Sequence, residues 1–197
     1  MSDKISTANE KDLNEMADAF LAGGINREEL IERAVKLKIP LDLLDLVVTS
    51  RAHVSAARPK LTEKKAIYLS FIQEVFNEGR IDKLDTFLSP AYVYRDAPPG
   101  TPAGAEGIKQ IVSMFRTAFP DLRITIEQQV AEDDVVCSRT TMRGTHKGPL
   151  FGVSATGNTV TVPGLTMVRI VNGRLVESWV KNDVTSLMKQ LGVNPSS

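Results

Sequence analysis

The chain has 197 residues, and its 42% hydrophobic and 24% charged content is ordinary for a globular protein with a buried core. Lysine plus arginine and aspartate plus glutamate number 24 each, so no overall charge favours nucleic acid or an anionic membrane. A single cysteine, Cys137, excludes an internal disulfide and any metal site built from several cysteines.

The N-terminal stretch MSDKISTANEKD is polar and lacks the apolar segment of a signal peptide. No apolar run further along the chain approaches the length that spans a membrane. We therefore expect a cytoplasmic protein that does not bind membranes.

Residues 1–59 predict an all-helical extension of three short helices. Asn26 can cap the second helix, and Glu29 stands where a capping box needs its carboxylate. The third helix is expected at about 41–57 and is closed by Pro59, since proline lacks the N–H that a helix interior needs. A core this small is marginal, so we expect the extension to pack against the rest of the protein or a second subunit.

Three short helices also suggest a DNA-binding helix-turn-helix, but the third helix argues against it. Its sequence LDLLDLVV is acidic and apolar, and such a face would repel phosphate. We therefore exclude nucleic acid as a partner.

Residues 60–197 predict an α+β domain in which the hydrophobic period changes from helical spacing to strict alternation. The first half has apolar residues on one helical face, and the second half alternates apolar and polar residues as half-buried strands do. This order favours helices gathered on one face of a curved antiparallel sheet. The expected helices are 63–78, 81–88, 108–119 and 184–191, and the expected strands are 91–95, 122–127, 135–143, 159–170 and 174–182.

The last two strands are joined by Asn172-Gly173, and Asn-Gly between two such strands is a strong hairpin signal. A two-residue turn would place Thr166 opposite Trp179. A three-residue loop with Gly173 in the left-handed conformation and a bulge would instead turn Val180 to the face of Thr166. The choice decides which side chains can meet.

We predict the bulged loop because it places Arg169 and Glu177 together on one face, whereas the two-residue turn sets Val168 against Glu177. The inner face is then largely aliphatic with a few polar points. Such a floor fits a pocket for a small hydrophobic molecule, and a solid core with satisfied hydroxyls is the alternative. The face comprises Val160, Val162, Thr166, Val168, Ile170, Val176, Ser178, Val180 and Asn182, while Trp179 and Met167 point outward.

Three stretches of the second domain carry a family resemblance: APPGTPAGAEGIKQIVSMFRTAFPDLRITIE, GTHKGPLFGVSATGNTV and RIVNGRLVESWVKNDVTSLMKQLG. With them, the chain from about residue 62 to 192 resembles the SnoaL-like polyketide cyclase family, also called ester cyclases. The resemblance implies the fold of the nuclear-transport-factor-2-like superfamily, a cone-shaped barrel in which three helices wrap a bent antiparallel sheet around a pocket. It also implies a homodimer through the outer sheet face, where we place Trp179 and Met167.

The resemblance implies a chemistry as well. Cyclases of this family close a ring by an aldol reaction without metal or organic cofactor, using an aspartate on the last strand and a histidine on the strand before it. In this chain those positions are Val180 and Thr166, and two further positions where relatives carry histidine are Arg95 and Ser178. All four family residues are missing, so the resemblance carries over the fold but not the acid/base pair.

Other residues must supply acid/base chemistry if the protein is an enzyme, and we single out His146, Asp96 and Tyr94. The neutral imidazole of His146 is a suitable base near physiological pH; a strand-end histidine bonded to backbone is the alternative. Asp96 follows Tyr94 and Arg95 at the start of a Pro/Gly loop, where it acts either as a base at a pocket mouth or as the ion-pair partner of Arg95. Asp183 precedes the last helix and is expected to cap it.

The sequence thus predicts a cofactor-independent cyclase or isomerase-type enzyme of secondary metabolism that acts on a small apolar, polyketide-like molecule. Its expected substrate-binding residues are Thr166, Ser178, Val180 and Asn182. No metal is expected, because His146 has no second ligand at convincing spacing. The alternative is a non-catalytic small-molecule-binding or assembly protein that has lost the family pair and docks a partner through its N-terminal helices.

Overall fold

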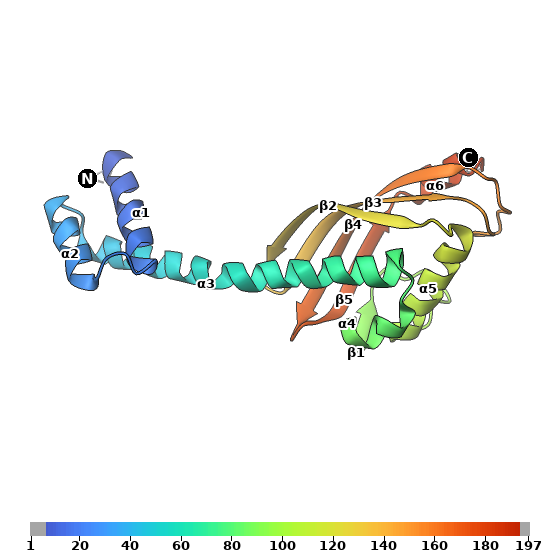
Figure 1. The fold of residues 1–197 in the computed structure, drawn as a ribbon, viewed down its shortest axis with the longest axis horizontal. Helices are drawn as coiled ribbons and strands as arrows, with labels where there is room; N and C mark the ends of the chain where they lie inside the picture. Colours follow the sequence, from blue (N-terminus) through green and yellow to red (C-terminus); the bar gives the residue numbers. More distant parts are fainter. Residues whose placement is uncertain (1–6, 194–197) are drawn as a thin grey trace. The chain divides into compact units, whose positions relative to one another are not determined.

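The computed structural model describes residues 7–193, with side chains for residues 10–52 and 60–193. The chain divides into two compact units, Met1–Lys60 and Leu61–Ser197. Figure 1 traces the chain through both of them. Within the described range, no helix combines the length and the apolar character needed to cross a membrane.

The first unit contains α1 (Thr7–Leu21), α2 (Arg27–Lys36) and the beginning of α3 (Leu41–Phe71). The predicted capping box is confirmed: Asn26 Oδ1 accepts from the Glu29 N–H, and Glu29 Oε2 accepts from the Asn26 N–H, both at 3.0 Å. The unit has a small core of its own, formed by Leu13, Met16, Leu30, Ala34, Ile39 and Leu44. Its docking onto a partner stays a prediction.

Helix α3 does not end at Pro59, and the prediction that this proline closes the segment is wrong. The backbone of α3 is helical over 31 residues, from Leu41 to Phe71. A proline in a helix interior removes one backbone hydrogen bond, at a cost of about 3 kcal/mol. The alanine, arginine, lysine and leucine residues on either side are strong helix formers, and their propensity opposes that cost.

From the end of α3 the chain continues into a π-helical turn, Ile72–Asn77. The Arg116 side chain donates hydrogen bonds to the carbonyl oxygens of Phe76 (3.0 Å) and Asn77 (2.7 Å), groups that the end of a helix leaves without intrahelical partners. A Cβ at Gly79 would lie 2.6 Å from Arg116 Nε, and the φ of Gly79 is +72°, so glycine is needed where the arginine passes. Short π-helical turns are frequent at functional sites.

The second unit contains five strands, β1 (Leu88–Tyr94), β2 (Arg123–Glu132), β3 (Val135–Thr145), β4 (Thr159–Val171) and β5 (Arg174–Asn182). Besides the end of α3, its helices are η2 (Ile81–Lys83), α4 (Leu84–Phe87), α5 (Gly104–Ala118) and α6 (Val184–Gln190). The strands form one open sheet in the order β1-β5-β4-β3-β2, and the predicted α+β class is confirmed.

The sheet is mixed rather than antiparallel throughout, because β1 pairs with β5 in parallel. We expected an antiparallel sheet, and for this pair the expectation is wrong. The two strands are far apart in the sequence and no hairpin links them, so the chain connection does not force opposite directions. The parallel pairing places the end of β1 beside the middle of β5, with Tyr94 next to Ser178.

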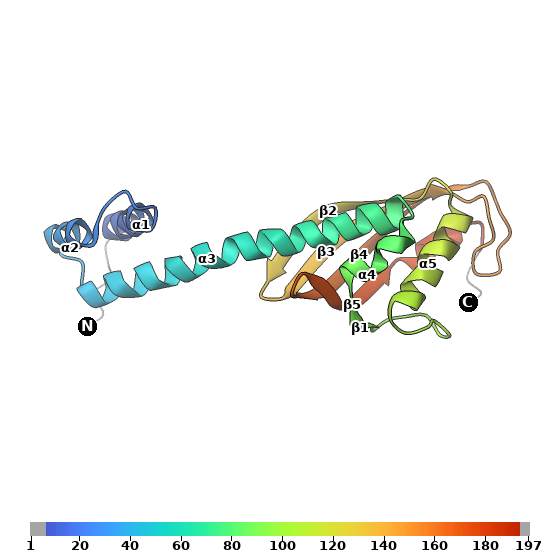
Figure 2. The same cartoon turned by 60° about the horizontal axis from the view of Figure 1, so that its bottom comes forward.

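Helices cover one face of the sheet, as Figures 1 and 2 show for the end of α3, α4 and α5. Along β4 exposed and buried residues alternate, so one face of the strand packs and the other faces solvent. The larger core cluster beneath the helices contains Tyr68, Phe71, Ile72, Val75, Leu84, Phe87, Leu88, Tyr92, Ile108, Val112, Val136, Val168, Ile170 and Leu175. A second cluster, around Phe119, includes Leu187 of α6.

The hairpin of β4 and β5 turns in two residues, so the prediction of a three-residue loop is wrong. Val171 pairs with Arg174, and both residues between them have positive φ, 50° for Asn172 and 75° for Gly173. Positive φ at both central positions defines a type I′ turn, whose twist matches that of the flanking strands. The Asn-Gly pair therefore needs no extra loop residue.

The predicted bulge exists, but it lies within β5 at Val176. Ile170 pairs with Leu175 and Arg169 pairs with Glu177, which leaves Val176 as the extra residue. Leu175 is consequently fully buried on the inner face, and Val176 is only half-buried. The assignment of Val176 to the inner face is wrong for this reason.

Beyond the bulge the predicted register is confirmed. Thr166 pairs with Val180, and Met167 pairs with Trp179. Thr166 is buried on the inner face, whereas Met167 is 37% exposed on the outer face. The bulge at Val176 therefore gives β4 and β5 the same pairing beyond it as the predicted bulged loop would.

Candidate functional site

The inner face of the sheet and the helices above it enclose a cavity of about 350 Å³. This volume is at the lower end of the range for small-molecule pockets. Most of the wall is aliphatic or aromatic, including Phe71, Ile72, Phe76, Ile108, Phe115, Met142, Val168 and Leu175. The second unit therefore contains a pocket, not a solid core.

Six of the seven residues predicted for the site line this cavity: Tyr94, Asp96, Thr166, Ser178, Val180 and Asn182. The seventh, His146, does not line it. Four polar residues of the lining were not among the predicted site residues: Tyr68, Tyr92, Thr140 and Lys181.

His146 is fully buried at the end of β3. Its ring lies 5.4 Å from that of Phe119, and its Nδ1 is 3.1 Å from Thr156 Oγ1 and accepts from the Thr156 N–H at 3.3 Å. Its backbone N–H donates to the carbonyl of Asn158 at 2.9 Å. His146 Nε2 is buried without a hydrogen-bond partner among the described residues, as Asp96 Oδ2 is, but His146 does not line the cavity. Its catalytic role stays a prediction, and its other contacts favour a structural role in closing the glycine-rich loop.

Replacing His146 with alanine is expected to lower the free energy of unfolding by about 2–4 kcal/mol, because the change leaves a void and removes the loop's hydrogen bonds. Turnover by the folded variant should stay close to that of the parent. Urea denaturation and a turnover assay on the same preparation measure both quantities, with Lys147→Ala as an exposed neighbouring control. Lost turnover at unchanged stability would assign His146 to the chemistry instead.

Tyr92 and Ser178 form a buried hydroxyl pair in the cavity wall. Tyr92 Oη lies 2.5 Å from Ser178 Oγ, and the two residues are 4% and 3% exposed. Burial raises the pKa of the Tyr92 phenol to about 12, although the hydrogen bond with Ser178 works in the opposite direction. Tyr92 is therefore a neutral phenol at physiological pH.

Tyr68, on α3, reaches the same wall from the helical side. Burial raises the pKa of its phenol, a hydrogen bond with the Thr166 side chain opposes that rise, and the nearby phenols of Tyr92 and Tyr94 add to it. The chain has three tyrosines, and all three line this one cavity.

The sequence carries a signal for Tyr92. Tyr92 and Tyr94 are two residues apart on one short strand, so their side chains point to the same face. Tyr68 carried a weaker signal, because its spacing with Phe71 and Ile72 is also that of an ordinary core-facing helix. Only the assembled fold distinguishes a core tyrosine from one that lines a cavity.

Asp96 lies directly after β1 with its two carboxylate oxygens in different surroundings. Oδ1 is 3.0 Å from Lys181 Nζ. Oδ2 is buried and has no hydrogen-bond partner among the described residues. The negative charge of Asp96 adds to burial in raising the pKa of the Tyr94 phenol, which places the two groups close together.

Arg95 does not pair with Asp96, which was the alternative left open by the sequence. It points instead to Glu177 and forms an ion pair with it, and Glu177 Oε2 is also 3.3 Å from Arg169 Nε. The Glu177 side chain is only 15% exposed between these two arginines. The ion pairs link the end of β1 to β5 and β4, and Asp96 faces the cavity instead of pairing with Arg95.

Glu177→Gln is expected to lower stability at neutral pH and to matter less in acid. The hydrogen bond and charge of Arg95, with those of Arg169, hold the pKa of Glu177 below its usual range. A depressed pKa stabilises the folded state above the ordinary glutamate value of about 4.3, and this gain is lost as the pH falls through the lower folded value. Urea denaturation at neutral pH and near pH 3 compares the variants, with Glu127→Gln as an exposed control on β2. A pH-independent difference would refute the ion-pair explanation.

One glycine shapes the floor of the cavity. Gly164 pairs with Thr140 on β3 and with Asn182 on β5. A Cβ at this position would lie 2.2 Å from Asn182 Oδ1 and 3.0 Å from Thr140 Oγ1. Because Gly164 has no side chain, the Asn182 amide and the Thr140 hydroxyl can approach each other across β4.

These groups suit proton transfer and hydrogen bonding in an apolar space. The cavity offers one carboxylate, one ammonium group, three phenols and several hydroxyls. Among the residues whose side chains are described, no three His, Cys, Asp or Glu side chains gather in a way that could hold a metal ion.

Comparison with known families places this site in context. The sequence model of the SnoaL-like polyketide cyclases matches residues 66–191. It starts within α3, so α1 and α2 lie outside the matched region. The comparison with curated proteins finds no match.

Several solved structures are similar to the second unit. TsrD from Streptomyces laurentii shares 27% identity at a TM-score of 0.61, covering 66% of this chain and 96% of its own. IdmH from Streptomyces antibioticus, a proposed polyketide cyclase, shares 33% identity at a TM-score of 0.58, covering 66% and 99%. AclR from Streptomyces galilaeus, a proposed hydroxylase, shares 27% identity at a TM-score of 0.61, covering 70% and 85%.

The neighbours share the nuclear-transport-factor-2-like fold, and the family match extends over more than half of the chain. Both agree with a cavity beneath a curved sheet, and they support a cyclase-type role in general terms. The chain belongs to the SnoaL-like polyketide cyclase family.

Proposed function

We propose that this protein is a cofactor-independent cyclase or isomerase-type enzyme that acts on a small apolar, polyketide-like molecule. The observation that carries the proposal is the carboxylate of Asp96, which has one buried oxygen without a partner among the described residues in the lining of an apolar cavity. A carboxylate in such surroundings is a suitable general base.

Asp96 removes a proton from the carbon next to a substrate carbonyl. The electron pair of that C–H bond moves into the carbonyl, and the enolate formed attacks a second carbonyl or is reprotonated at another carbon. Lys181 holds the other carboxylate oxygen at 3.0 Å and so orients the base. Tyr94 is a protonated phenol beside Asp96. In a cyclisation it donates its proton to the new alkoxide oxygen and recovers one from the protonated Asp96, so both groups return to their starting state.

The apolar wall makes the second contribution, because it folds a flexible chain so that the reacting carbons lie close together. Phe76, Phe115 and Met142 supply large surfaces without competing polar groups. A cavity of about 350 Å³ suits a compact substrate of one or two rings in its cyclised form.

The positions of the family acid/base pair are adjacent in this chain but carry no ionisable group. Thr166 and Val180 are direct cross-strand partners, and both line the cavity. The lack of an ionisable group at both positions favours the second candidate, a non-catalytic protein that binds a small molecule. The presence of Asp96 and Lys181 in the same lining favours the enzyme.

The test is turnover of polyketide-like β-ketone substrates, with products identified by liquid chromatography and mass spectrometry. Mass spectrometry of any small molecule that copurifies narrows the choice of substrates. An enzyme gives products whose formation depends on Asp96. Tight binding of the same molecules without conversion assigns the protein to the second candidate.

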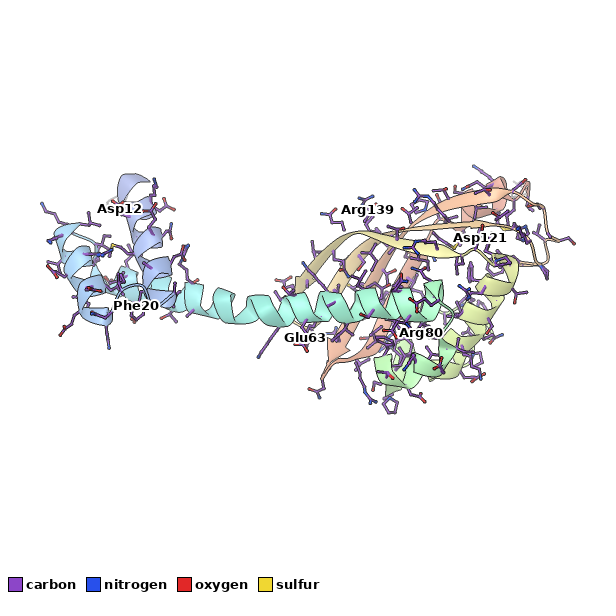
Figure 3. All side chains as sticks on the ribbon, in the orientation of Figure 1. Asp12, Phe20, Glu63, Arg80, Asp121 and Arg139 are labelled. Carbon is purple, nitrogen blue, oxygen red and sulfur yellow. The ribbon has the colours of Figure 1, made fainter. Side chains whose placement is uncertain are left out.

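We further propose that two copies associate through the outer face of the sheet. Val130, Cys137, Met167 and Trp179 follow one another across β2, β3, β4 and β5 in the pairing register. Val130 is 58% and Met167 37% exposed, so this row presents apolar surface to solvent. Arg139 lies on the same face and points away from the helices (Figure 3), which gives the row a polar border.

A further inference from the structure

We propose that two buried hydroxyl pairs, Tyr92 with Ser178 and Tyr68 with Thr166, bind the carbonyl oxygen of the substrate and hold it as it becomes an enolate oxygen. The substrate is accordingly a ketone or a related carbonyl compound with an acidic C–H next to the carbonyl. This inference rests on the proposed function of Asp96 as the base that removes that proton.

A count of hydroxyl hydrogens supports the first pair. Tyrosine and serine hydroxyls each donate one hydrogen and can each accept. The bond between Tyr92 Oη and Ser178 Oγ, 2.5 Å long, uses one of the two hydrogens whichever group donates. Among the described residues neither hydroxyl has another hydrogen bond, so one O–H hydrogen remains for a ligand in the cavity.

The same count applies to the second pair. Against the effect of burial, the Thr166 side chain lowers the pKa of the Tyr68 phenol, so the two groups lie close together, and both line the cavity. Each hydroxyl carries one hydrogen, so at least one is left over whether or not the two bond to each other. Tyr68 and Thr166 are only 3% and 5% exposed, so bulk water does not accept a hydrogen bond from them. A buried donor without an acceptor is unfavourable, and an acceptor atom of a ligand would satisfy it.

The two pairs lie side by side on the inner face of the sheet. Thr166 pairs with Val180 and Val168 pairs with Ser178, so Thr166 and Ser178 are diagonal neighbours on adjacent strands. Diagonal neighbours are roughly 7–8 Å apart at the backbone, within reach of a tyrosine hydroxyl from the opposite side. The unused hydrogens therefore belong to one small region of the cavity.

The donors remain protonated over the useful pH range, as an oxyanion site requires. Burial raises the pKa of Tyr92 to about 12 and also raises that of Tyr68. Neutral donors in an apolar cavity stabilise charge that develops on a ligand oxygen more strongly than water-exposed donors do.

The base stands on the same side as these donors. Tyr94 pairs with Ser178 in the β1–β5 register, and Asp96 follows two residues later on the chain. A substrate whose carbonyl oxygen accepts from the hydroxyl pairs thus presents its neighbouring C–H toward Asp96. The proton passes to Asp96 Oδ2, the C–H electron pair forms the C=C bond, and the negative charge comes to rest on the oxygen held by the hydroxyls.

The test uses 2-naphthol as a probe, because its ionised form mimics an enolate. Absorbance titration gives the pKa of the bound naphthol, and fluorescence gives its dissociation constant. The parent protein is expected to lower the pKa of the bound naphthol, and 2-methoxynaphthalene, which has no ionisable oxygen, is expected to bind more weakly. Tyr92→Phe combined with Ser178→Ala removes both hydrogens of the first pair and should weaken naphtholate binding by about tenfold or more, because hydrogen bonds to a charged group are among the stronger ones. Tyr92→Phe or Tyr68→Phe alone should weaken it less, because the remaining Ser178 or Thr166 hydroxyl can still donate.

Controls separate this inference from loss of folding and from failure of the proposed function. Tyr92→Phe combined with Ser178→Ala removes both hydroxyls of a pair and leaves no orphan group, and Thr140→Val removes a cavity hydroxyl outside the pairs. Asp96→Asn should reduce turnover by about 10²–10⁴-fold yet keep naphtholate binding. Unchanged probe pKa and affinity in the folded Tyr92→Phe/Ser178→Ala variant overturn the hydroxyl site, whereas normal turnover by Asp96→Asn overturns the proposed function alone.

Discussion

Asp96→Asn is expected to reduce turnover by about 10²–10⁴-fold, the usual contribution of a positioned general base. Asparagine has the shape of aspartate and keeps an oxygen for Lys181, but its amide cannot take a proton. The substrate dissociation constant should change little, because the cavity walls are untouched. Steady-state kinetics and a separate binding titration with the parent's substrate measure the two effects.

Asp85→Asn is the matched control, an exposed aspartate on α4 that receives the same chemical change. Lys181→Met should give a smaller loss than Asp96→Asn, since it only frees the carboxylate from its orientation at 3.0 Å. Full turnover by Asp96→Asn would remove Asp96 from the mechanism and show that another group acts as the base.

Met167→Arg is expected to convert a dimer into monomers at micromolar concentration. Met167 lies in the middle of the apolar row that crosses four strands. In a two-fold symmetric interface every substitution occurs twice, so two new charges would be buried together. Weakening by about 100-fold or more corresponds to roughly 3 kcal/mol, a modest value for burying like charges.

Size-exclusion chromatography with light scattering on the full chain measures this association. Leu69→Arg is the matched control, because Leu69 is an exposed apolar residue on α3, outside the row. The proposed interface is refuted if the parent protein is a monomer, or if Met167→Arg leaves the dimer intact while Leu69→Arg dissociates it.

Local signals in the sequence determined much of the fold. The bounds of β5, the capping box at Asn26 and the cap of Asp183 on the Ser186 N–H all follow from residues close together in the chain. The family resemblance added the topology and the existence of a pocket. The expected pairing of Arg169 with Glu177 placed Thr166 and Ser178 on the inner face, and the structure has them there.

Two expectations from the sequence were wrong where local signals conflicted. Pro59 is a helix breaker by its own geometry, yet α3 continues through it. A bulge in the turn and a bulge at Val176 both bring Arg169 and Glu177 to the same face. The structure has the second arrangement. Both outcomes depend on the balance between neighbouring elements, which no single motif contains.

The sequence by itself determined the element order, the α+β class and six of the residues that line the cavity. Only the tertiary structure decided that Tyr68 and Tyr92 meet Thr166 and Ser178, that Asp96 pairs with Lys181, and that His146 lies outside the cavity. The physical reason is separation along the chain. Helix caps and strand alternation depend on residues a few positions apart, whereas the site is made by contacts such as Tyr92–Ser178, which join residues 86 positions apart.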